Sequence, residues 1–352
     1  MNLQQAIAAV QPPCEDSREA ARRRFSDIAI PLGSLGLLQD AVAQLAAIQR
    51  TVRPSIAKRA VVMFCADNGV VAQGVTQCGQ EVTATVTENM GRGKSTVCLM
   101  AKHIGMDSFP VDIGVARDVE GERILRRKIR YGTADMTKEP AMTREEAVRA
   151  LETGIQMTEW CAAQGYRLVC GGEMGIGNTT TSAAVTAVLT GANMRDVTGR
   201  GAGLSSEGLE RKVHAIETAL KLHQPDPDDP VDILHKVGGL DIAGMAGFYL
   251  GAAACDLPVV LDGVISCAAA LIAVRLCPAV RDYLIAAHQS AEPAGRLLLE
   301  ALGYTPFISA GMRLGEGTSA VAAVAMIDLV LAAYDGMPSF DEAGIEAYQP
   351  LV

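Results

Sequence analysis

The sequence predicts an α/β fold, a mostly parallel sheet with helices on both faces and a small helical domain beside it. Short β-branched apolar runs alternate with longer Ala-rich helical stretches, the usual pattern of a parallel sheet. The 352 residues are enough to bury a large core without disulfides or a structural metal. With 49% apolar and 20% charged residues, the composition excludes a disordered chain.

Strands are predicted at residues 60–64, 107–111, 166–169 and 258–261, with a weaker one at 306–310. Helices are predicted at 144–163, 180–189, 207–222, 242–254 and 319–334. Thr143 and Glu146 have the spacing of a capping box at the start of the first of these helices. The Pro- and Asp-rich segment 223–232 is predicted to be a loop.

The two ends of the chain are expected to pack together as a small helical domain. We therefore expect a large α/β domain with the substrate site over residues 56–315. Residues 1–55 and 316–352 would form the small domain.

Composition excludes several classes of protein. The net charge of −9 argues against a nucleic-acid or anionic membrane surface. The N-terminal residues lack a secretory signal, and no uncharged apolar run reaches the roughly 18 residues of a membrane span. Nine cysteines without a CxxC motif suggest reduced thiols, and the five histidines lack metal-ligand spacing. We expect a soluble cytoplasmic protein without a zinc site.

The glycine-rich segment GGEMGIGNTTTS, residues 171–182, is the strongest candidate for an anion site. It joins a predicted strand to a predicted helix, whose first N–H groups are unpaired donors at the positive helix end. Gly175 and Gly177 would let a phosphate approach the backbone closely. The alternative is a tight turn capped by threonines. Lys212 would add a positive charge to the same site, or would simply lie on a helix surface.

Glu316 lies between two glycines in GMRLGEGTSAVAA, residues 311–323, just before a predicted helix. It would either cap that helix, where the dipole lowers its pKa, or act as a general base. Apolar surroundings raise a carboxylate pKa toward the value that suits a base near pH 7. The residues alone leave these two roles open.

Other motifs are weaker. Residues 91–97, GRGKSTV, lack the first glycine of a P-loop and are expected to break a helix. GRGAG at 199–203 lacks the full dinucleotide-binding spacing, and the basic run 126–128 is predicted to be a solvated strand edge. LDGVIS (261–266) and HQSAEP (288–293) add polar residues at the ends of expected strands, where ligands bind in open parallel sheets.

Taken in order, these segments resemble the nicotinate-nucleotide:dimethylbenzimidazole phosphoribosyltransferases of cobamide nucleotide-loop assembly. The resemblance covers nearly the whole chain. Its motifs are PLGSLG (31–36), CADNGV (65–70), GEMGIGNTT (172–180), KVGGLDIAGM (236–245), LPVVLDG (257–263), HQSAEP (288–293) and MRLGEG (312–317).

The resemblance implies a Rossmann-like domain with a small helical domain, assembled as a dimer. It implies transfer of phosphoribose from nicotinate mononucleotide to an aromatic base, with inversion at the anomeric carbon and with no metal or cofactor. Glu316 would be the general base, and Glu173 would hold the reactants from the opposite wall. The residues implied for phosphate and ribose binding are Gly175, Ile176, Gly177, Asn178, Thr179, Gly201, Gly203, Lys212, Asp262, Gly263 and Ser290.

The base pocket implied by the resemblance comprises Cys78, Val86, Leu314 and Met312. Cys78 and Val86 stand where the family has Ser and Gln, and Asn68 stands where His is common. Loss of these polar partners would leave a polar base unpaired at a cost of about 1–3 kcal/mol. We therefore hypothesise that this member also accepts simpler aromatics such as phenol or a methylphenol.

Two other functions are compatible with parts of the pattern. The altered pocket could belong to a non-catalytic substrate-binding subunit that forms a heterodimer with an active paralogue. Retention of Glu316, Glu173 and the phosphate turn argues against it. A nicotinamide-cofactor dehydrogenase would rest only on the α/β pattern and the weak glycine motifs.

Overall fold

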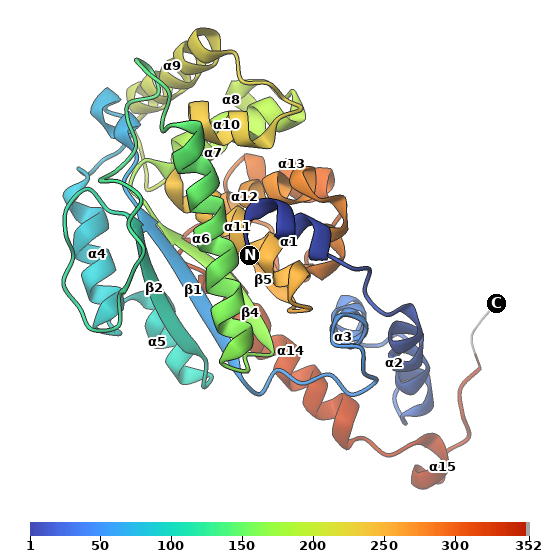
Figure 1. Ribbon diagram of the computed structural model, residues 1–352. Coiled ribbons are helices and arrows are strands. Elements are labelled where there is room, and N and C mark those ends of the chain that lie inside the picture. The colour runs from blue at the N-terminus through green and yellow to red at the C-terminus, as the bar shows by residue number, and fades with distance from the viewer. Residues whose placement is uncertain (350–352) are drawn as a thin grey trace.

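The computed structural model, described over residues 1–349, contains a six-stranded sheet in the order β3-β2-β1-β4-β5-β6 (Figure 1). Each pair of neighbouring strands is parallel. The strands are β1 (Arg59–Ala66), β2 (Asp107–Gly114), β3 (Leu125–Arg126), β4 (Leu168–Met174), β5 (Val259–Leu261) and β6 (Leu284–Ala286). This arrangement confirms the predicted fold class.

Helices connect the strands and cover both faces of the sheet. They are α1 (Leu3–Ala9), α2 (Glu15–Asp27), α3 (Leu37–Ile48), α4 (Glu81–Gly91), α5 (Thr96–His103), α6 (Arg144–Ala163), α7 (Asn178–Thr190), α8 (Met194–Val197), α9 (Ser206–His223), α10 (Pro230–Val237), α11 (Leu240–Ala254), α12 (Val264–Leu276), α13 (Ala294–Leu302), α14 (Thr318–Gly336) and α15 (Phe340–Ala343). Two short 3₁₀ helices lie at Gly69–Gln73 and Pro278–Tyr283.

The predictions for the strands near 60, 107 and 258 are confirmed. Of the basic run 126–128, only Arg126 lies in the edge strand β3, and Lys128 is largely buried and pairs with Asp112 at 3.1 Å. The strand predicted at 166–169 ends too early, because β4 continues through two glycines to Met174. A side chain at Gly172 would overlap the backbone carbonyl of Glu316, so glycine permits this close approach. The predicted strand at 306–310 is wrong, since that segment makes one isolated bridge and the last strand is β6.

The predicted long helices are confirmed to within a few residues. Helix α6 has the predicted bounds, and Thr143 forms the expected capping box with Glu146. The loop predicted at 223–232 is shorter than expected because α10 begins within it. Pro230 takes the first helical position, where its missing N–H is not needed, and Asp229 caps the helix.

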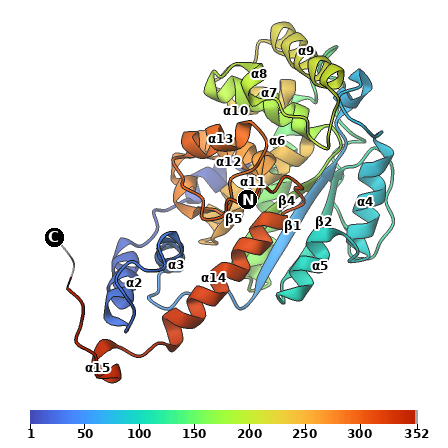
Figure 2. The ribbon, with the colours of Figure 1, turned by 180° about the vertical axis from the view of Figure 1, so that it is seen from behind.

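Strand β1 shows how the sheet divides the core. Val62 and Phe64 face one apolar cluster, built with α6, α11 and α12, whereas Val61 and Met63 face a second, built with α3, α5 and α14. Because both faces are covered, every residue of β1 is buried. Figure 2 shows α14 and α5 across the face opposite to α6 and α11.

The two ends of the chain meet on the second face. Helix α2 packs against α3, α3 packs against α14, and the Phe25 and Tyr334 rings lie 4.7 Å apart. Helix α1 instead packs against α6 and α11. The division into domains at 56 and 315 stays a prediction.

Helix α14 is long and apolar enough to cross a membrane by length and composition alone. Half of its most apolar window is nevertheless buried inside the protein, where α14 packs against β4 and β5. This is the packing of a core helix.

Candidate active site

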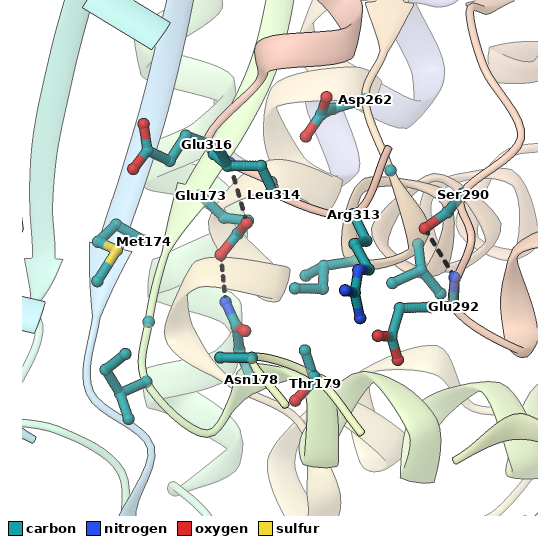
Figure 3. Close-up of a pocket in the computed structure, with 18 of the residues that line it drawn as sticks. Glu173, Met174, Asn178, Thr179, Asp262, Ser290, Glu292, Arg313, Leu314 and Glu316 are labelled. Atoms are coloured by element: carbon teal, nitrogen blue, oxygen red, sulfur yellow. Dashed lines mark hydrogen bonds between the residues drawn. The ribbon is translucent and has the colours of Figure 1, made fainter. Parts of the chain in front are cut away.

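A cavity of about 250 Å³ opens at the carboxyl ends of the parallel strands. Its walls come from the end of β4, the segments after β5 and β6, the turn before α7, the loop before α9 and the loop before α14. Figure 3 shows Glu173 and Glu316 on one side of this cavity and Ser290 and Glu292 on the other. The expectation that Glu173 lies on the wall opposite to Glu316 is therefore wrong, since the N–H of Glu316 donates to Glu173. The carboxyl edge of an open parallel sheet is where α/β proteins bind ligands, which agrees with the sequence argument.

The loop that carries Glu316 has an unusual backbone. Glu316 has φ 63°, between Gly315 at 88° and Gly317 at 98°. The left-handed region costs free energy for a residue with a Cβ, and such strain persists only where the surroundings enforce it. The surroundings include Asp262, whose carboxylate accepts hydrogen bonds from the N–H of Gly317 at 3.0 Å and from the N–H of Ser319 at 2.9 Å. Asp262 therefore fixes the loop and caps α14.

The carboxylate of Glu316 is half-buried and lines the cavity. One oxygen accepts a hydrogen bond of 3.3 Å from the N–H of Val97 at the start of α5. That hydrogen bond lowers the pKa, but burial raises it more, so the pKa of Glu316 lies above its ordinary value. In Figure 3 this carboxylate points away from Arg313 and Glu292. A carboxylate of raised basicity on a residue that lines the cavity has the properties of a general base.

Glu173 is buried at the end of β4. One carboxyl oxygen accepts the N–H of Glu316 at 3.3 Å, and the other accepts the side-chain amide of Asn178. The same amide donates to Asp241 at 2.9 Å. Burial, together with the nearby charges of Asp241 and Asp262, raises the pKa of Glu173 to about 8. Glu173 is therefore mostly protonated at neutral pH and adds little negative charge beside Glu316.

The opposite side of the cavity has the features of an anion site. Gly177, with φ 94°, precedes α7, and Thr179, Gly201, Gly203 and Ser290 line the same region. The N–H groups of Asn178 and Thr180 donate to the carbonyls of Gly175 and Gly177 at 3.0 and 2.9 Å, so the N–H of Thr179 is the donor that the start of this helix offers to an anion. The sequence argument expects Lys212 to reach this site directly.

Lys212 is fully buried one layer behind the cavity wall. Its ammonium group donates to the Thr179 hydroxyl at 2.7 Å and to the Gly199 carbonyl at 3.1 Å. Burial lowers the pKa of Lys212 to about 8, while the nearby carboxylate of Glu292 opposes this shift. The lysine is thus a buried cation that supports the wall and keeps a positive charge behind it.

Comparisons with known proteins agree with the site. A family model described as a phosphoribosyltransferase matches residues 10–345. A nicotinate-nucleotide–dimethylbenzimidazole phosphoribosyltransferase of Acetivibrio thermocellus is 45% identical over 99% of this chain and 100% of its own length. One of Ruminiclostridium cellulolyticum is 43% identical over 100% of both chains. The crystal structure of CobT from Thermus thermophilus superimposes with a TM-score of 0.89 at 38% identity, covering 95% of this chain and 100% of that one.

The chain belongs to the nicotinate-nucleotide:dimethylbenzimidazole phosphoribosyltransferase family. It is accordingly an enzyme of the pentosyltransferase class.

In this phosphoribosyltransferase, most residues predicted for the site line the cavity, Cys78, Met312, Leu314, Ile176 and Gly263 among them. Val86 does not. It lies on α4 and packs against the apolar core on the α14 side of the sheet, because the helix turns it away from the wall. The carboxylate of Asp262 and the side-chain amide of Asn178 line the cavity but are already engaged by protein partners.

Sequence reasoning missed several residues of the wall. Arg200 lies within the GRGAG segment, and Gln77 directly precedes Cys78. His288 lies between the Asp262 and Met312 carbonyls at 3.3 Å from each. In the view of Figure 3 the Arg313 guanidinium lies between the carboxylates of Glu173 and Glu292. Arg313 lies in the motif that contains Glu316, and Glu292 lies in the motif that contains Ser290, so these motifs are the sequence signal that could identify both residues.

Proposed function

We propose that this enzyme transfers phosphoribose from nicotinate mononucleotide to an aromatic base during cobamide nucleotide-loop assembly, releasing nicotinate. One observation carries the proposal: a carboxylate of raised basicity and an anion site share one cavity. In this proposal the phosphate of the nucleotide lies at the glycine turn and its anomeric carbon lies near Glu316. The names of the relatives support the same substrates.

In the proposed reaction, a nitrogen or oxygen of the base attacks the anomeric carbon from the face opposite to nicotinate. The bond between that carbon and the pyridinium nitrogen breaks, and its electron pair stays on nicotinate. The proton of the attacking group passes to the carboxylate of Glu316. A neutral Glu173 accompanies this step better than an ionised one would, because a second negative charge nearby would favour the protonated form of Glu316, which cannot accept the proton. Proximity and one base then supply the catalysis.

The proposed phosphate contacts are the N–H of Thr179 at the start of α7, the glycines at 201 and 203, and the Ser290 hydroxyl. The charge of Lys212 would act through the Thr179 hydroxyl, which the ammonium group already touches. Electrostatic attraction is stronger in the low-dielectric interior than in water, so a cation one layer away still favours a dianion.

The finer proposal concerns the base. Cys78 gives the wall a half-buried thiol in place of a hydroxyl, and Leu314 and Met312 add apolar surface. Such a wall offers few partners to a second ring nitrogen, so we expect phenol or p-cresol to be accepted as well as dimethylbenzimidazole. The thiol must stay reduced, which fits a cytoplasmic enzyme.

The test is to incubate the purified protein with nicotinate mononucleotide and either dimethylbenzimidazole or p-cresol and to measure nicotinate release. Release that disappears in Glu316→Gln, with mononucleotide binding retained, is the expected result. Cys78→Ser should shift the ratio of kcat/KM toward dimethylbenzimidazole. Turnover of dimethylbenzimidazole alone would contradict the finer proposal, and binding without any release would favour a subunit that requires an active paralogue.

We also propose that the enzyme works as a dimer. Leu329 on α14 is 73% exposed and Leu99 on the neighbouring α5 is 58% exposed, so both leave apolar surface that a second copy would cover. Light scattering on the purified chain tests this assembly. A monomer that dimerises only with a paralogue would identify a heterodimer.

A further inference from the structure

Asp241 is a buried carboxylate outside the cavity. It lies in the first turn of α11, within the motif KVGGLDIAGM, and has no exposed surface. It is not among the residues that line the cavity. Its oxygens accept the side-chain amide of Asn178 at 2.9 Å and the N–H of Ile242 at 3.0 Å. Both of these partners are neutral donors, so the carboxylate is held by hydrogen bonds to amides.

Asn178 links this carboxylate to the cavity. Its side-chain nitrogen carries two hydrogens, one for Asp241 and one for Glu173. The amide nitrogen is therefore fully used, and its plane is fixed from both sides. The other oxygen of Glu173 accepts a hydrogen bond from the backbone N–H of Glu316. A continuous series of hydrogen bonds thus joins Asp241 to the backbone of the proposed general base.

We propose that Asp241 is a positioning residue for the transfer reaction, acting on Glu173 through the side-chain amide of Asn178. It holds the amide so that the second N–H stays on Glu173, and it keeps a negative charge behind that carboxyl group. The inference rests on the proposed function, because it assumes that Glu173 faces the reactants.

The groups around Glu173 determine in which direction each substitution changes its pKa. The groups that face it are the carboxylates of Asp241 and Asp262, the thiol of Cys65, the side-chain amide of Asn178 and the backbone N–H of Glu316. On the cavity side lies the guanidinium of Arg313, which both variants leave in place. The negative charge of Asp241 raises the pKa of Glu173, whereas the hydrogen bond from Asn178 lowers it. Removing the charge and removing the amide should therefore move this pKa in opposite directions.

Two variants test this difference. Asp241→Asn keeps the shape and an acceptor for Asn178 but removes the charge, and Asn178→Ser removes the linking amide. With nicotinate mononucleotide and the base that the wild type uses, kcat should fall at high pH as Glu173 ionises. We expect the midpoint of that fall to move down by about 1 pH unit in Asp241→Asn and to move up in Asn178→Ser.

A purely structural role would lower kcat or stability without opposite shifts, so shifts in the same direction, or none, would overturn the proposal. Placing Asp241→Asn in a Glu173→Gln background should abolish the shift, and Asp228→Asn on the exposed loop is the matched control. If Asp241→Asn does not fold, Asp241→Ser, which also removes the charge, takes its place in the same comparison with Asn178→Ser.

The two proposals fail in different ways. If the wild type turns over no base, the proposed function fails, and the same opposite shifts are then measured from the pH dependence of thermal unfolding. If turnover is normal but Glu173→Gln leaves the pH profile unchanged, Glu173 is not the group being titrated and the inference on Asp241 is wrong.

Discussion

Lys212 places a positive charge behind the cavity wall instead of in it. The ammonium group is fully buried and donates to the Thr179 hydroxyl and the Gly199 carbonyl. Burial favours its neutral form, which is why its pKa falls to about 8. A bound phosphate dianion would favour the charged form again. The buried ammonium group thus favours binding of an anion, but it lowers the stability of the protein when no anion is bound.

At the scale of this residue, we predict that Lys212→Met weakens binding of nicotinate mononucleotide about 10- to 100-fold, which corresponds to about 1.4–2.8 kcal/mol. Methionine keeps much of the volume and removes the charge. Titration calorimetry at pH 7 measures the effect, and Lys221→Met, at an exposed position of the same helix, should bind like the wild type. Equal affinities for both variants would exclude a role of Lys212 in phosphate binding.

The pH dependence gives a second prediction for the same residue. Because the folded pKa is lowered to about 8, wild-type Lys212 loses its proton as the pH rises from 7 to 9. Affinity for the mononucleotide should therefore fall over this interval in the wild type and stay flat in Lys212→Met. A parallel decline in both proteins would show that another group controls the affinity.

At the scale of elements, the start of α14 depends on a distant segment. Asp262, which follows β5, accepts the backbone N–H groups of Gly317 and Ser319 and the Ser319 hydroxyl. These N–H groups have no partner inside the helix, so the carboxylate satisfies them as a cap does. The same contacts hold Glu316 in its left-handed conformation. One side chain therefore connects the stability of a core helix to the geometry of the site.

We predict that Asp262→Ala destabilises the protein by about 2–3 kcal/mol, since a buried cap is lost and buried donors are left unpaired. The expected loss of activity is larger than the loss of stability implies, because Glu316 is released as well. Urea unfolding measures the first effect and nicotinate release the second. Asp228→Ala, at an exposed loop position, serves as the control, and an unchanged urea midpoint in Asp262→Ala would refute the capping role.

The elements also show what local sequence can and cannot predict. The bounds of helix α6 are predictable because a capping box and a long helical period are local signals. Strand β6, Leu284–Ala286, escapes prediction because three residues carry no period, and pairing with β5 makes it a strand. The apolar run at 306–310 has the composition of a strand, but it pairs only through one bridge, between Ile308 and His288, just beyond the end of the edge strand β6.

At the scale of the whole molecule, the site depends on contacts between residues far apart in the chain. The glycine turn and Glu316 could be recognised because glycines mark close backbone approach. The link from Asn178 to Asp241 spans 63 positions, and the hydrogen bond from Glu316 to Glu173 spans 143. No local pattern contains such pairs, so the engagement of Asn178 and the position of Lys212 behind the wall became visible only in the folded structure.

These long-range contacts gather several carboxyl groups in the interior. Burial raises the pKa of Glu173 to about 8 and that of Asp241 to about 6, and it raises the pKa of Glu316 and Asp67 as well. Each of these folded pKa values lies above the value expected in the unfolded chain. The stability that these groups contribute is therefore fully present at low pH and is lost as the pH rises through the folded pKa.

We accordingly predict that the melting temperature of the ligand-free enzyme falls as the pH rises from 5.5 to 8.5. Glu173→Gln should flatten the curve, because a neutral amide cannot ionise in the interior, and at pH 8.5 it should be more stable than the wild type by a few kcal/mol, on the order of what this pKa shift allows. Glu139→Gln, at an exposed position, should follow the wild-type curve.

Stability that rises over this interval in the wild type would mean that the interior carboxylates are compensated by cations, and the neutral state assigned to Glu173 would then be wrong. A falling curve that Glu173→Gln flattens would instead identify Glu173 as a group kept neutral by the fold, the state in which it best accompanies a single ionised base.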